Sequence, residues 1–516
     1  MRRNTTLLAV TAFAVAAAAT GTVAPAAAAV STDTSSFRTA VTIGGMTEHL
    51  AGLKAAADTN SDTRASGTPG YEASAVYVER QLTAAGYAPE RQYFDFDYFQ
   101  DLGARAFSAG GTDYVVGTDF VVMDYSGSTG GLPKSATIVA VNDNIVPIDQ
   151  ASPAGTSNAG CEAADFADAV FTGAIALIQR GTCTFAVKVA NAEAAGAIGV
   201  IIFNEGQEAL DRSGVVLGTL GGPSDIPVIG ATYALGVQLT QALDIGPVTA
   251  SITTDTISET RETFNVIAET DTGRTDRVVV VGAHLDSVAE GPGINDNGSG
   301  SSAILEIAEE IANTDLTNQV RFIWFGAEES GLLGAEYYVS QLTARERKDI
   351  AVNLNFDMLG SPNFARFIYD GDGSATGTSG PNGSGNVERV FAQYFASQGL
   401  YTEETAFDGR SDYGPFIDAG IPAGGLFSGA EDIKTDEQAQ PDKFGGTAGV
   451  AYDACYHQAC DDISNVNLMG LDQLADAAAH AVLTFAETTS AVSGTAKVSQ
   501  GNASVEAEYK GHSLKR

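Results

Sequence analysis

The chain has 516 residues, of which 44% are hydrophobic and 18% are charged, and its 58 glycines are typical of a globular protein with many turns. This length suggests two or three domains and is sufficient to bury an enzyme-sized site. The formal net charge of −36 comes from 64 Asp and Glu residues against 28 Lys and Arg residues. Because nucleic-acid binding depends mainly on basic side chains that displace counterions, this charge argues against a nucleic-acid partner.

Residues 1–29 have the layout of a secretory signal peptide. Two arginines precede an almost wholly apolar run from Leu7 to Ala19, and small residues follow as far as Ala29. A membrane-spanning helix needs roughly twenty apolar residues, so this shorter run favours a cleaved signal. We expect cleavage near Ala29 and a secreted, extracellular mature protein without a membrane segment.

The chain contains four cysteines, Cys161, Cys183, Cys455 and Cys460. An exported protein meets an oxidising environment, in which an even number of cysteines usually pairs. Sequence alone permits three pairings. The pairs Cys161–Cys183 and Cys455–Cys460 close the shortest loops, so two local disulfides are the simplest arrangement.

Two parts of the chain, residues 36–98 and 257–489, have the pattern of an α/β domain. In the first, GTPGYEASAVYVERQLTAAGY (67–87) places apolar residues at three- and four-residue steps, which indicates a helix. In the second, apolar strands alternate with helical stretches. This alternation predicts a mainly parallel, doubly wound sheet with helices on both faces, whose functional residues gather at the carboxyl ends of the strands. We expect the tail, 490–516, to be flexible or processed.

Between these parts, residues 99–256 consist of short β-rich pieces separated by Gly, Ser and Asp turns. The stretch CEAADFADAVFTGAIALIQRGTCTFAVKVANAEAAGAIGVIIFNE (161–205) has a cysteine pair flanking a strand, a basic turn, and a helix that leads to a second buried strand. This stretch resembles a protease-associated domain. The resemblance implies a lid or a substrate filter, whereas the alternative is an insertion that only adds stability.

Potential metal ligands follow apolar strands or lie in Gly-rich turns, where a doubly wound sheet would bring them together. They are His284, Asp286, Asp296, Glu328, Glu329, Asp357 and His457. Converging carboxylates repel one another, and a pair of divalent cations neutralises them directly. Imidazole and carboxylate ligands without thiolate suit zinc, cobalt or manganese. We expect the other three histidines, His49, His480 and His512, to be structural.

These ligands belong to a dense set of motifs over residues 283–460: AHLDS, GPGINDNGSG, WFGAEESGLLGAEYY, LNFDMLG, FDGRSDYGPF, GIPAGGLFSGAE and CYHQAC. In this order, they resemble the secreted two-zinc aminopeptidases of peptidase family M28, particularly those of the streptomycete type. The resemblance spans about half of the chain and implies an enzyme that removes single residues from the free N-terminus of peptides. It also implies a fold of the zinc-peptidase type.

The resemblance implies a role for each matching residue. Asp296 bridges two Zn²⁺ ions, His284 and Asp357 complete one metal site, and Glu329 and His457 complete the other. Asp286 orients the His284 imidazole, as metal-bound histidines usually require. A cis peptide bond follows Asp296.

The resemblance also implies the catalytic and substrate-binding groups. Glu328 is the general base, and Tyr456 hydrogen-bonds the developing oxyanion. Glu328 and Asp357, with the main chain at Gly409 and Arg410, bind the substrate ammonium. Two apolar side chains line the pocket for the first side chain, for which we expect a large apolar residue such as Leu: Met358 and Phe427.

A calcium site at Asp472 and Asp476 is possible, because these residues lie four apart on one helical face, but we favour a solvated acidic surface.

We expect a monomer that acts on peptides with a free N-terminus. One rival is a receptor or binding module that has lost its metals, but the ligand set is complete. Another is a carboxypeptidase or a different amide hydrolase, which needs a basic residue for a terminal carboxylate or a different pocket.

Overall fold

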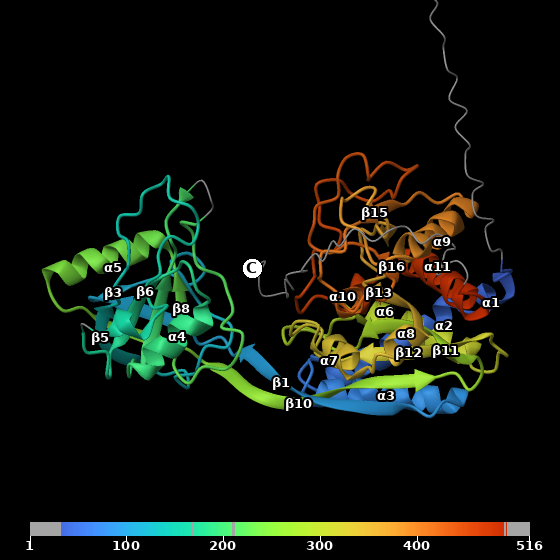
Figure 1. Ribbon diagram of the computed structural model, residues 1–516, viewed down its shortest axis with the longest axis horizontal. Coiled ribbons are helices and arrows are strands. Elements are labelled where there is room, and N and C mark those ends of the chain that lie inside the picture. Colours follow the sequence, from blue (N-terminus) through green and yellow to red (C-terminus); the bar gives the residue numbers. More distant parts are fainter. Residues whose placement is uncertain (1–31, 168, 209–211, 490–491, 493–516) are drawn as a thin grey trace, which may run out of the picture. The chain divides into compact units, whose positions relative to one another are not determined.

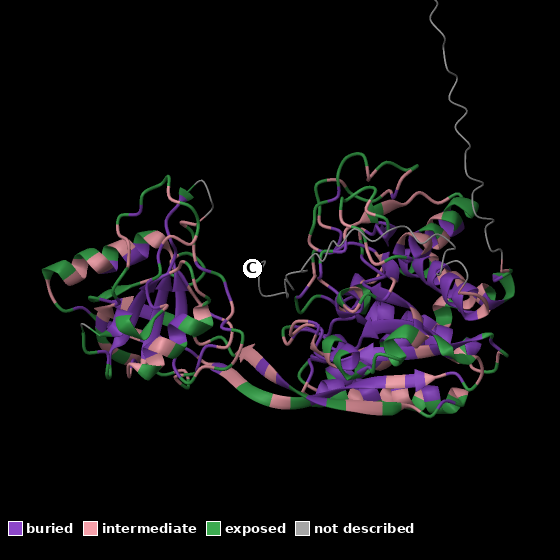
Figure 2. Ribbon diagram, in the orientation of Figure 1, coloured by how far each residue is buried: buried purple, intermediate pink, exposed green. Residues whose placement is uncertain are grey.

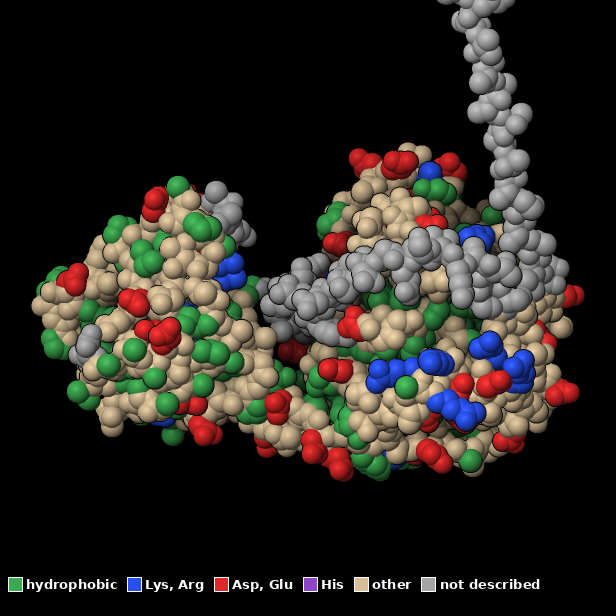
Figure 3. Space-filling model, in the orientation of Figure 1, with side chains coloured by type: hydrophobic (Ala, Val, Ile, Leu, Met, Phe, Trp, Pro, Cys, Tyr) green, Lys and Arg blue, Asp and Glu red, His purple; other side chains and the backbone are tan. Residues whose placement is uncertain are grey.

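The computed structural model describes residues 32–167, 169–208, 212–489 and 492 (Figure 1). The predicted signal peptide and, apart from residue 492, the predicted tail lie outside these residues. Within the described part, no helix combines the length and apolar character needed to cross a membrane. Acidic side chains are scattered over the face shown in Figure 3 rather than gathered in one patch.

The N-terminal helices begin and end at local signals in the sequence. Thr42 and Thr68 precede the second and third helices, and each side chain accepts a hydrogen bond from a main-chain N–H of the first turn. The third helix has Pro69 at its start, and it ends at Gly86, which has a φ of 108° that favours glycine. The three helices, which confirm the predicted helical pattern, are α1 (Ser35–Ala40), α2 (Ile43–Asp58) and α3 (Pro69–Ala85).

A first eight-stranded sheet contains the strands predicted after residue 257. Four of its neighbouring pairs are parallel and three are antiparallel, so the predicted mainly parallel sheet is confirmed. In spatial order the strands are β1 (Glu90–Asp101), β10 (Thr256–Glu269), β12 (Asn318–Phe325), β11 (Arg274–His284), β13 (Ile350–Asp357), β16 (Ala423–Phe427), β14 (Phe367–Tyr369) and β15 (Glu403–Thr405).

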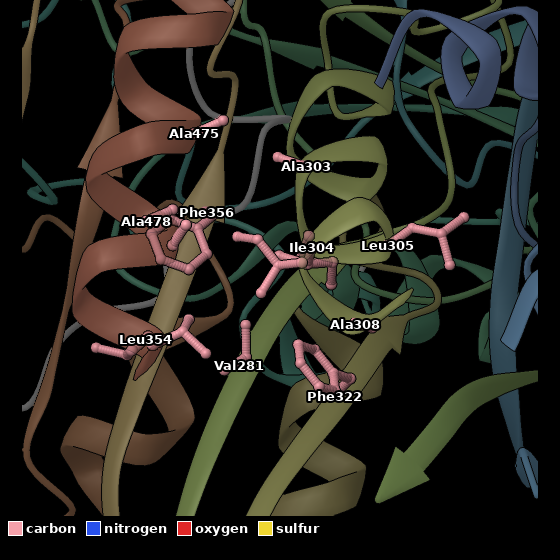
Figure 4. Packing of buried hydrophobic residues seen from close by; sticks show 14 of the residues in the cluster. Val281, Ala303, Ile304, Leu305, Ala308, Phe322, Leu354, Phe356, Ala475 and Ala478 are labelled. Carbon is pink, nitrogen blue, oxygen red and sulfur yellow. The ribbon is translucent and has the colours of Figure 1, made fainter. Parts of the chain in front are cut away.

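Helices cover both faces of this sheet. Alternate residues of a strand point to opposite faces, so Val281 of β11 and Val280 belong to different hydrophobic clusters. Figure 4 shows Val281 and Phe356 packed against Ile304 of α6. In Figure 2 the central strands of this sheet are buried, whereas parts of β1 and β10 and the outer faces of the helices are exposed. On the Val281 face lie α2, α3, α6 (Gly298–Ile311), α9 (Ser384–Ser397) and α11 (Leu468–Glu487), and on the Val280 face lie α7 (Leu333–Gln341) and α10 (Tyr413–Asp418).

The chain between β1 and β10 forms a second eight-stranded sheet. The strands β1 and β10 themselves pair with each other in antiparallel register. Its core is divided by the sheet into two clusters, with one helix on each. In spatial order the strands are β3 (Thr112–Asp113), β2 (Ala106–Ala109), β9 (Thr249–Thr253), β5 (Lys134–Ala140), β6 (Ile175–Gln179), β7 (Gly199–Phe203), β8 (Val228–Ala231) and β4 (Phe120–Val122), and the helices are α4 (Phe185–Ala194) and α5 (Tyr233–Ile245).

The remaining described elements are short. They are the helix α8 (Glu346–Asp349) and the 3₁₀ turns η1 (Ala163–Phe166) and η3 (Ile463–Asn465). Disulfides join Cys161 to Cys183 and Cys455 to Cys460, which is the pairing with the shortest loops. The second sheet lies within the predicted insert 99–256. The boundaries of this insert and of the other predicted domains stay a prediction.

Candidate active site

The predicted metal ligands come from the carboxyl ends of neighbouring parallel strands. His284 and Asp357 are the last residues of β11 and β13, and Glu329 follows the end of β12 by a short turn. The strands β12, β11 and β13 lie side by side in the sheet, so their ends meet at one edge. Asp296 precedes α6, and His457 lies in the loop that the second disulfide closes.

Asp296 lies between the two histidines and faces one with each carboxylate oxygen. Its Oδ1 is 3.3 Å from Nε2 of His284, and its Oδ2 is 2.8 Å from Nε2 of His457. Asp357 Oδ1 is also 3.3 Å from the His284 nitrogen, and Glu329 Oε2 is 3.2 Å from the His457 nitrogen. Three overlapping groups of potential ligands therefore meet here: two share Asp296, and the third is formed by His284, Glu328 and Glu329.

These buried groups perturb one another electrostatically. Burial by itself raises the pKa of Asp296, but hydrogen bonds with both histidines hold it well below its usual range. Burial lowers the pKa of His457, whereas Glu329 and Asp296 raise it, to about 9. Burial raises the pKa of Glu328 well above its usual range, against the opposing charge of His284. The carboxylates thus concentrate negative charge in a buried space and stabilise positive charge there.

The donor atoms fit a divalent metal. Each group combines one imidazole nitrogen with carboxylate oxygens, which is a ligand set typical of catalytic zinc. In addition, Glu329 Oε1 is buried and has no hydrogen-bond partner within the described residues. A buried carboxylate oxygen without a donor is costly, and a bound cation would satisfy it.

Polar groups around the ligands hold them in place. Nδ1 of His284 lies 3.1 Å from the main-chain oxygen of Asp286 and 3.8 Å from its carboxylate. That carboxylate instead accepts a hydrogen bond from the main-chain N–H of Glu328, at 3.2 Å. Ser411, which the sequence reasoning did not single out, donates a 2.5 Å hydrogen bond to Asp357 Oδ2. Asp286 therefore connects His284 to the turn that carries Glu328.

The loop before Asp296 is held by two residues that sequence reasoning also missed. The carboxylate of Asp461 accepts hydrogen bonds from the main-chain N–H groups of Asn295, at 2.8 Å, and Asp296, at 2.9 Å. The fully buried guanidinium of Arg64 donates to carbonyl oxygens of the same loop, among them that of Pro292 at 2.7 Å. The Asp296–Asn297 peptide bond is cis, as the resemblance implies. Nothing in the sequence around Arg64 or Asp461 indicates their contacts with this loop.

Tyr456 and Arg410 lie together at the site. The Tyr456 ring stacks on that of His457 with the centroids 3.5 Å apart, and Arg410 donates a 3.1 Å hydrogen bond to the Tyr456 hydroxyl. A pocket opens beside these residues and the ligands. Of the predicted substrate-binding residues, it is lined by Gly409, Arg410, Met358 and Phe427.

Asp472 and Asp476, the pair considered for a calcium site, lie on α11, after the active-site residues in the sequence. Asp476 is 3.4 Å from a guanidinium nitrogen of Arg38 and accepts a 3.3 Å hydrogen bond from Tyr394. Asp472 is exposed. Since Asp476 already has a cationic partner, a solvated acidic surface remains the simpler interpretation.

Comparisons with known proteins agree with this geometry. Residues 265–482 match Peptidase family M28, and residues 136–239 match the PA domain. An aminopeptidase of Pseudomonas aeruginosa is 48% identical over 438 residues, which cover 84% of this chain and 78% of that protein. Leucine aminopeptidase 2 of Trichophyton equinum is 46% identical over 333 residues, covering 64% of this chain and 66% of that one.

Solved structures show the same fold. The aminopeptidase of Aneurinibacillus sp. strain AM-1 matches with a TM-score of 0.64 and 26% identity, over 87% of this chain and 95% of that one. A zinc aminopeptidase of Bacillus subtilis matches with a TM-score of 0.56 and 25% identity, over 87% and 96%. The chain therefore belongs to peptidase family M28, as a metal-dependent aminopeptidase with an inserted protease-associated domain.

Proposed function

We propose that the chain is a secreted aminopeptidase that uses two zinc ions and prefers large apolar first residues. One observation carries the two-metal proposal: Asp296 directs one carboxylate oxygen at His284 and the other at His457, so one side chain belongs to two ligand groups. In this assignment His284 and Asp357 complete one site, and Glu329 and His457 complete the other. When bound, the ions lower the pKa of a water and polarise the scissile carbonyl.

Glu328 is the proposed general base. Its Oε2 is 4.0 Å from Nε2 of His284, farther than the oxygens of Asp296 and Asp357, so we assign it no metal. It lines the pocket, where its carboxylate would take a proton from the attacking water and pass it to the leaving amine. Asp286 supports this position through the Glu328 main-chain N–H.

Tyr456 is the proposed donor to the developing oxyanion. Because Arg410 donates to the tyrosine oxygen, the hydroxyl hydrogen is free to point to another acceptor. The Cys455–Cys460 disulfide and the stacking on His457 restrict where the ring can lie. A hydroxyl held in this way can stabilise the negative charge that forms on the carbonyl oxygen.

The pocket supports an N-terminal residue rather than a C-terminal one. The carboxylates of Glu328 and Asp357, with the main chain at Gly409 and Arg410, can bind an ammonium group. A carboxypeptidase would need a free basic group, but Arg410 is paired with Glu431 at 3.1 Å. Met358 and Phe427 give one wall an apolar surface, which together with the names of the leucine aminopeptidase relatives supports a preference for Leu.

Secretion and the roles of the two domains belong to the same proposal. The signal peptide pattern of residues 1–29 and the two disulfides are those of an exported protein. We assign residues 36–98 and 257–489 to the peptidase domain and 99–256 to the protease-associated domain. The zinc-binding peptidase acts on peptide substrates as a monomer.

Hydrolysis of leucine amide compared with its N-acetylated form tests the proposal directly. We expect cleavage of the free amide only, inhibition by a chelator, and recovery when zinc is restored. The metal of the purified, active protein should include two catalytic zinc ions per chain. Equal hydrolysis of the blocked substrate, or full activity in protein stripped of metal, would contradict the proposal.

A further inference from the structure

A second cluster of potential metal ligands lies between α2 and α6, outside the active site. His49 of α2 and Glu306 and Glu309 of α6 direct one nitrogen and two carboxylate oxygens toward one another, all within 4.8 Å. The two glutamates are three residues apart and therefore share one face of α6. His49 is 2% exposed, although the sequence indicated only a structural role for it.

The His49 imidazole is oriented as in a metal ligand. Its Nδ1 lies 3.0 Å from the hydroxyl of Tyr77, which in turn donates a 3.4 Å hydrogen bond to the main-chain oxygen of Glu48. The tyrosine oxygen can therefore accept the Nδ1 proton, which leaves the lone pair of a neutral ring on Nε2. Within the described residues this buried Nε2 has no hydrogen-bond partner.

The carboxylate of Glu306 is also held in one orientation. Its Oε1 accepts hydrogen bonds from the main-chain N–H and the hydroxyl of Thr42, both at 3.0 Å. Any side chain on Gly45 would collide with the carboxylate, so the glycine allows its close approach to α2. With Oε1 satisfied, Oε2 points at His49 Nε2 from 3.4 Å.

The distances favour a shared cation over a direct hydrogen bond. A charged N–H···O hydrogen bond is about 2.7–2.9 Å long, whereas Nε2 of His49 is 3.4 Å from Glu306 and 3.7 Å from Glu309. Two ligands about 2.0–2.1 Å from one tetrahedral zinc ion lie about 3.3–3.4 Å apart. In the active site, the corresponding distances from His284 are 3.3 Å.

The negative charges around the cluster also favour a bound cation. Besides His49, the charged groups with the largest effect on Glu309 are the carboxylates of Glu306, Glu310 and Glu48. The Glu309 side chain is 29% exposed, so an ion can enter from solvent and keep water ligands.

We propose that His49, Glu306 and Glu309 bind a divalent cation of the zinc and manganese type, separate from the catalytic pair. The cation joins α2 to α6, the helix that begins directly after Asp296 and Asn297. It is structural, because none of its ligands lines the substrate pocket.

Crystals of the unmodified protein grown with zinc test the location without any substitution. We expect an anomalous difference peak within about 2.0–2.2 Å of His49 Nε2 and of one oxygen of each glutamate. The absence of this peak, while density is present at Asp296, would show that the proposal is wrong and leave the proposed function intact. Density at the His49 cluster but none at Asp296 would support this proposal and contradict the catalytic one.

Matched variants test the same site in solution. Glu309→Gln and His49→Gln should each lower the zinc bound after dialysis by about one equivalent per chain, with hydrolysis of leucine amide retained. The controls are the neighbouring acid, in Glu310→Gln, and another helical histidine, the partly buried His480, in His480→Gln. Both variants should keep the full zinc content. If the folded Glu309→Gln protein binds as much zinc as its Glu310→Gln control, His49 is held by an ion pair and not by a metal.

Discussion

Glu205 of the protease-associated domain and Glu329 of the peptidase domain both follow the carboxyl end of a parallel strand, yet their surroundings are opposite. The two oxygens of Glu205 accept main-chain hydrogen bonds from residues 155–157, at 2.6 to 3.2 Å, and pair with Arg212 at 3.0 Å. Glu329 instead has one buried oxygen without a hydrogen-bond partner in the described part and directs the other at His457.

The comparison shows what distinguishes a structural carboxylate from a candidate metal ligand. Both residue type and position after a strand are shared, so neither identifies the site. The difference is whether the fold itself supplies the donors. Around Glu205 a loop of the chain supplies them, whereas around Glu329 the nearest groups are other acids and an imidazole, a setting in which a bound cation would satisfy the carboxylate.

The largest expected effect separates two neighbouring acids in the active site. Glu328→Gln removes a proton acceptor but no proposed ligand, so kcat should fall by about 10²–10⁴-fold with the metal content unchanged. Glu329→Gln weakens one metal site, so excess zinc should restore part of its activity. Metal analysis and kinetics on both variants check this prediction. Near-normal turnover of Glu328→Gln, or equal metal loss in both, would reverse the assignment.

The two disulfides extend the comparison to the two domains. Replacing Cys455 by Ser frees the loop that carries Tyr456 and His457, so kcat/KM should fall about 10–100-fold, as when a group that orients a metal ligand is lost. Replacing Cys161 by Ser should mainly loosen the inserted domain. Kinetics on the folded variants with leucine amide measure this difference. An equal loss of kcat/KM in both would show that the second disulfide does not position the site.

Glu205→Gln tests the structural member of the pair. Burial raises the pKa of Glu205, but hydrogen bonds from three main-chain N–H groups and the charge of Arg212 lower it below its usual range, so the ionised form is favoured. An amide in its place turns an N–H₂ group toward donors, and the free energy of unfolding should drop by about 1–3 kcal/mol. Denaturant titration measures this drop, and the zinc content should be unchanged. Loss of zinc from this variant would show that Glu205 is not purely structural and would contradict the comparison with Glu329.

The smallest expected effect is a pH dependence at His480, whose ring nitrogen Nδ1 is 2.8 Å from the Thr34 hydroxyl. Burial, together with the charge of Arg38, lowers the pKa of this histidine to about 4, below the unfolded value of about 6.5. The unfolded chain therefore takes up the proton first. The stabilisation by neutral His480 is complete above pH ~6.5 and is lost as the pH falls toward about 4.

His480→Gln should accordingly flatten the acid side of the stability profile. We compare the free energy of unfolding of the variant with that of the unmodified protein. Since the His480 side chain is partly exposed, we expect this difference to change by only about 1 kcal/mol between neutral pH and pH ~4. Denaturation at several pH values measures this change. A constant difference across that range would show that His480 is as easily protonated in the folded protein as in the unfolded one.

The sequence by itself determined the elements and the membership of the main site. Helical periodicity, continuous apolar strands and Gly-rich turns are local features, so the helix at 67–87 and the mainly parallel sheet could be predicted. The carboxyl-end rule then placed His284 and Asp357 at one edge. The order of motifs pointed to the peptidase family, which the relatives confirm.

Only the tertiary structure decided which polar groups are satisfied. Arg64 and Asp461 act on the loop of Asp296 from distant parts of the chain, and nothing in their neighbouring residues indicates these contacts. His49 likewise reads as an ordinary helical residue until α2 packs on α6 and brings two glutamates toward its Nε2. Hydrogen bonds and charge act over a few ångströms in space, whatever the separation along the chain, so their balance becomes visible only in the folded protein.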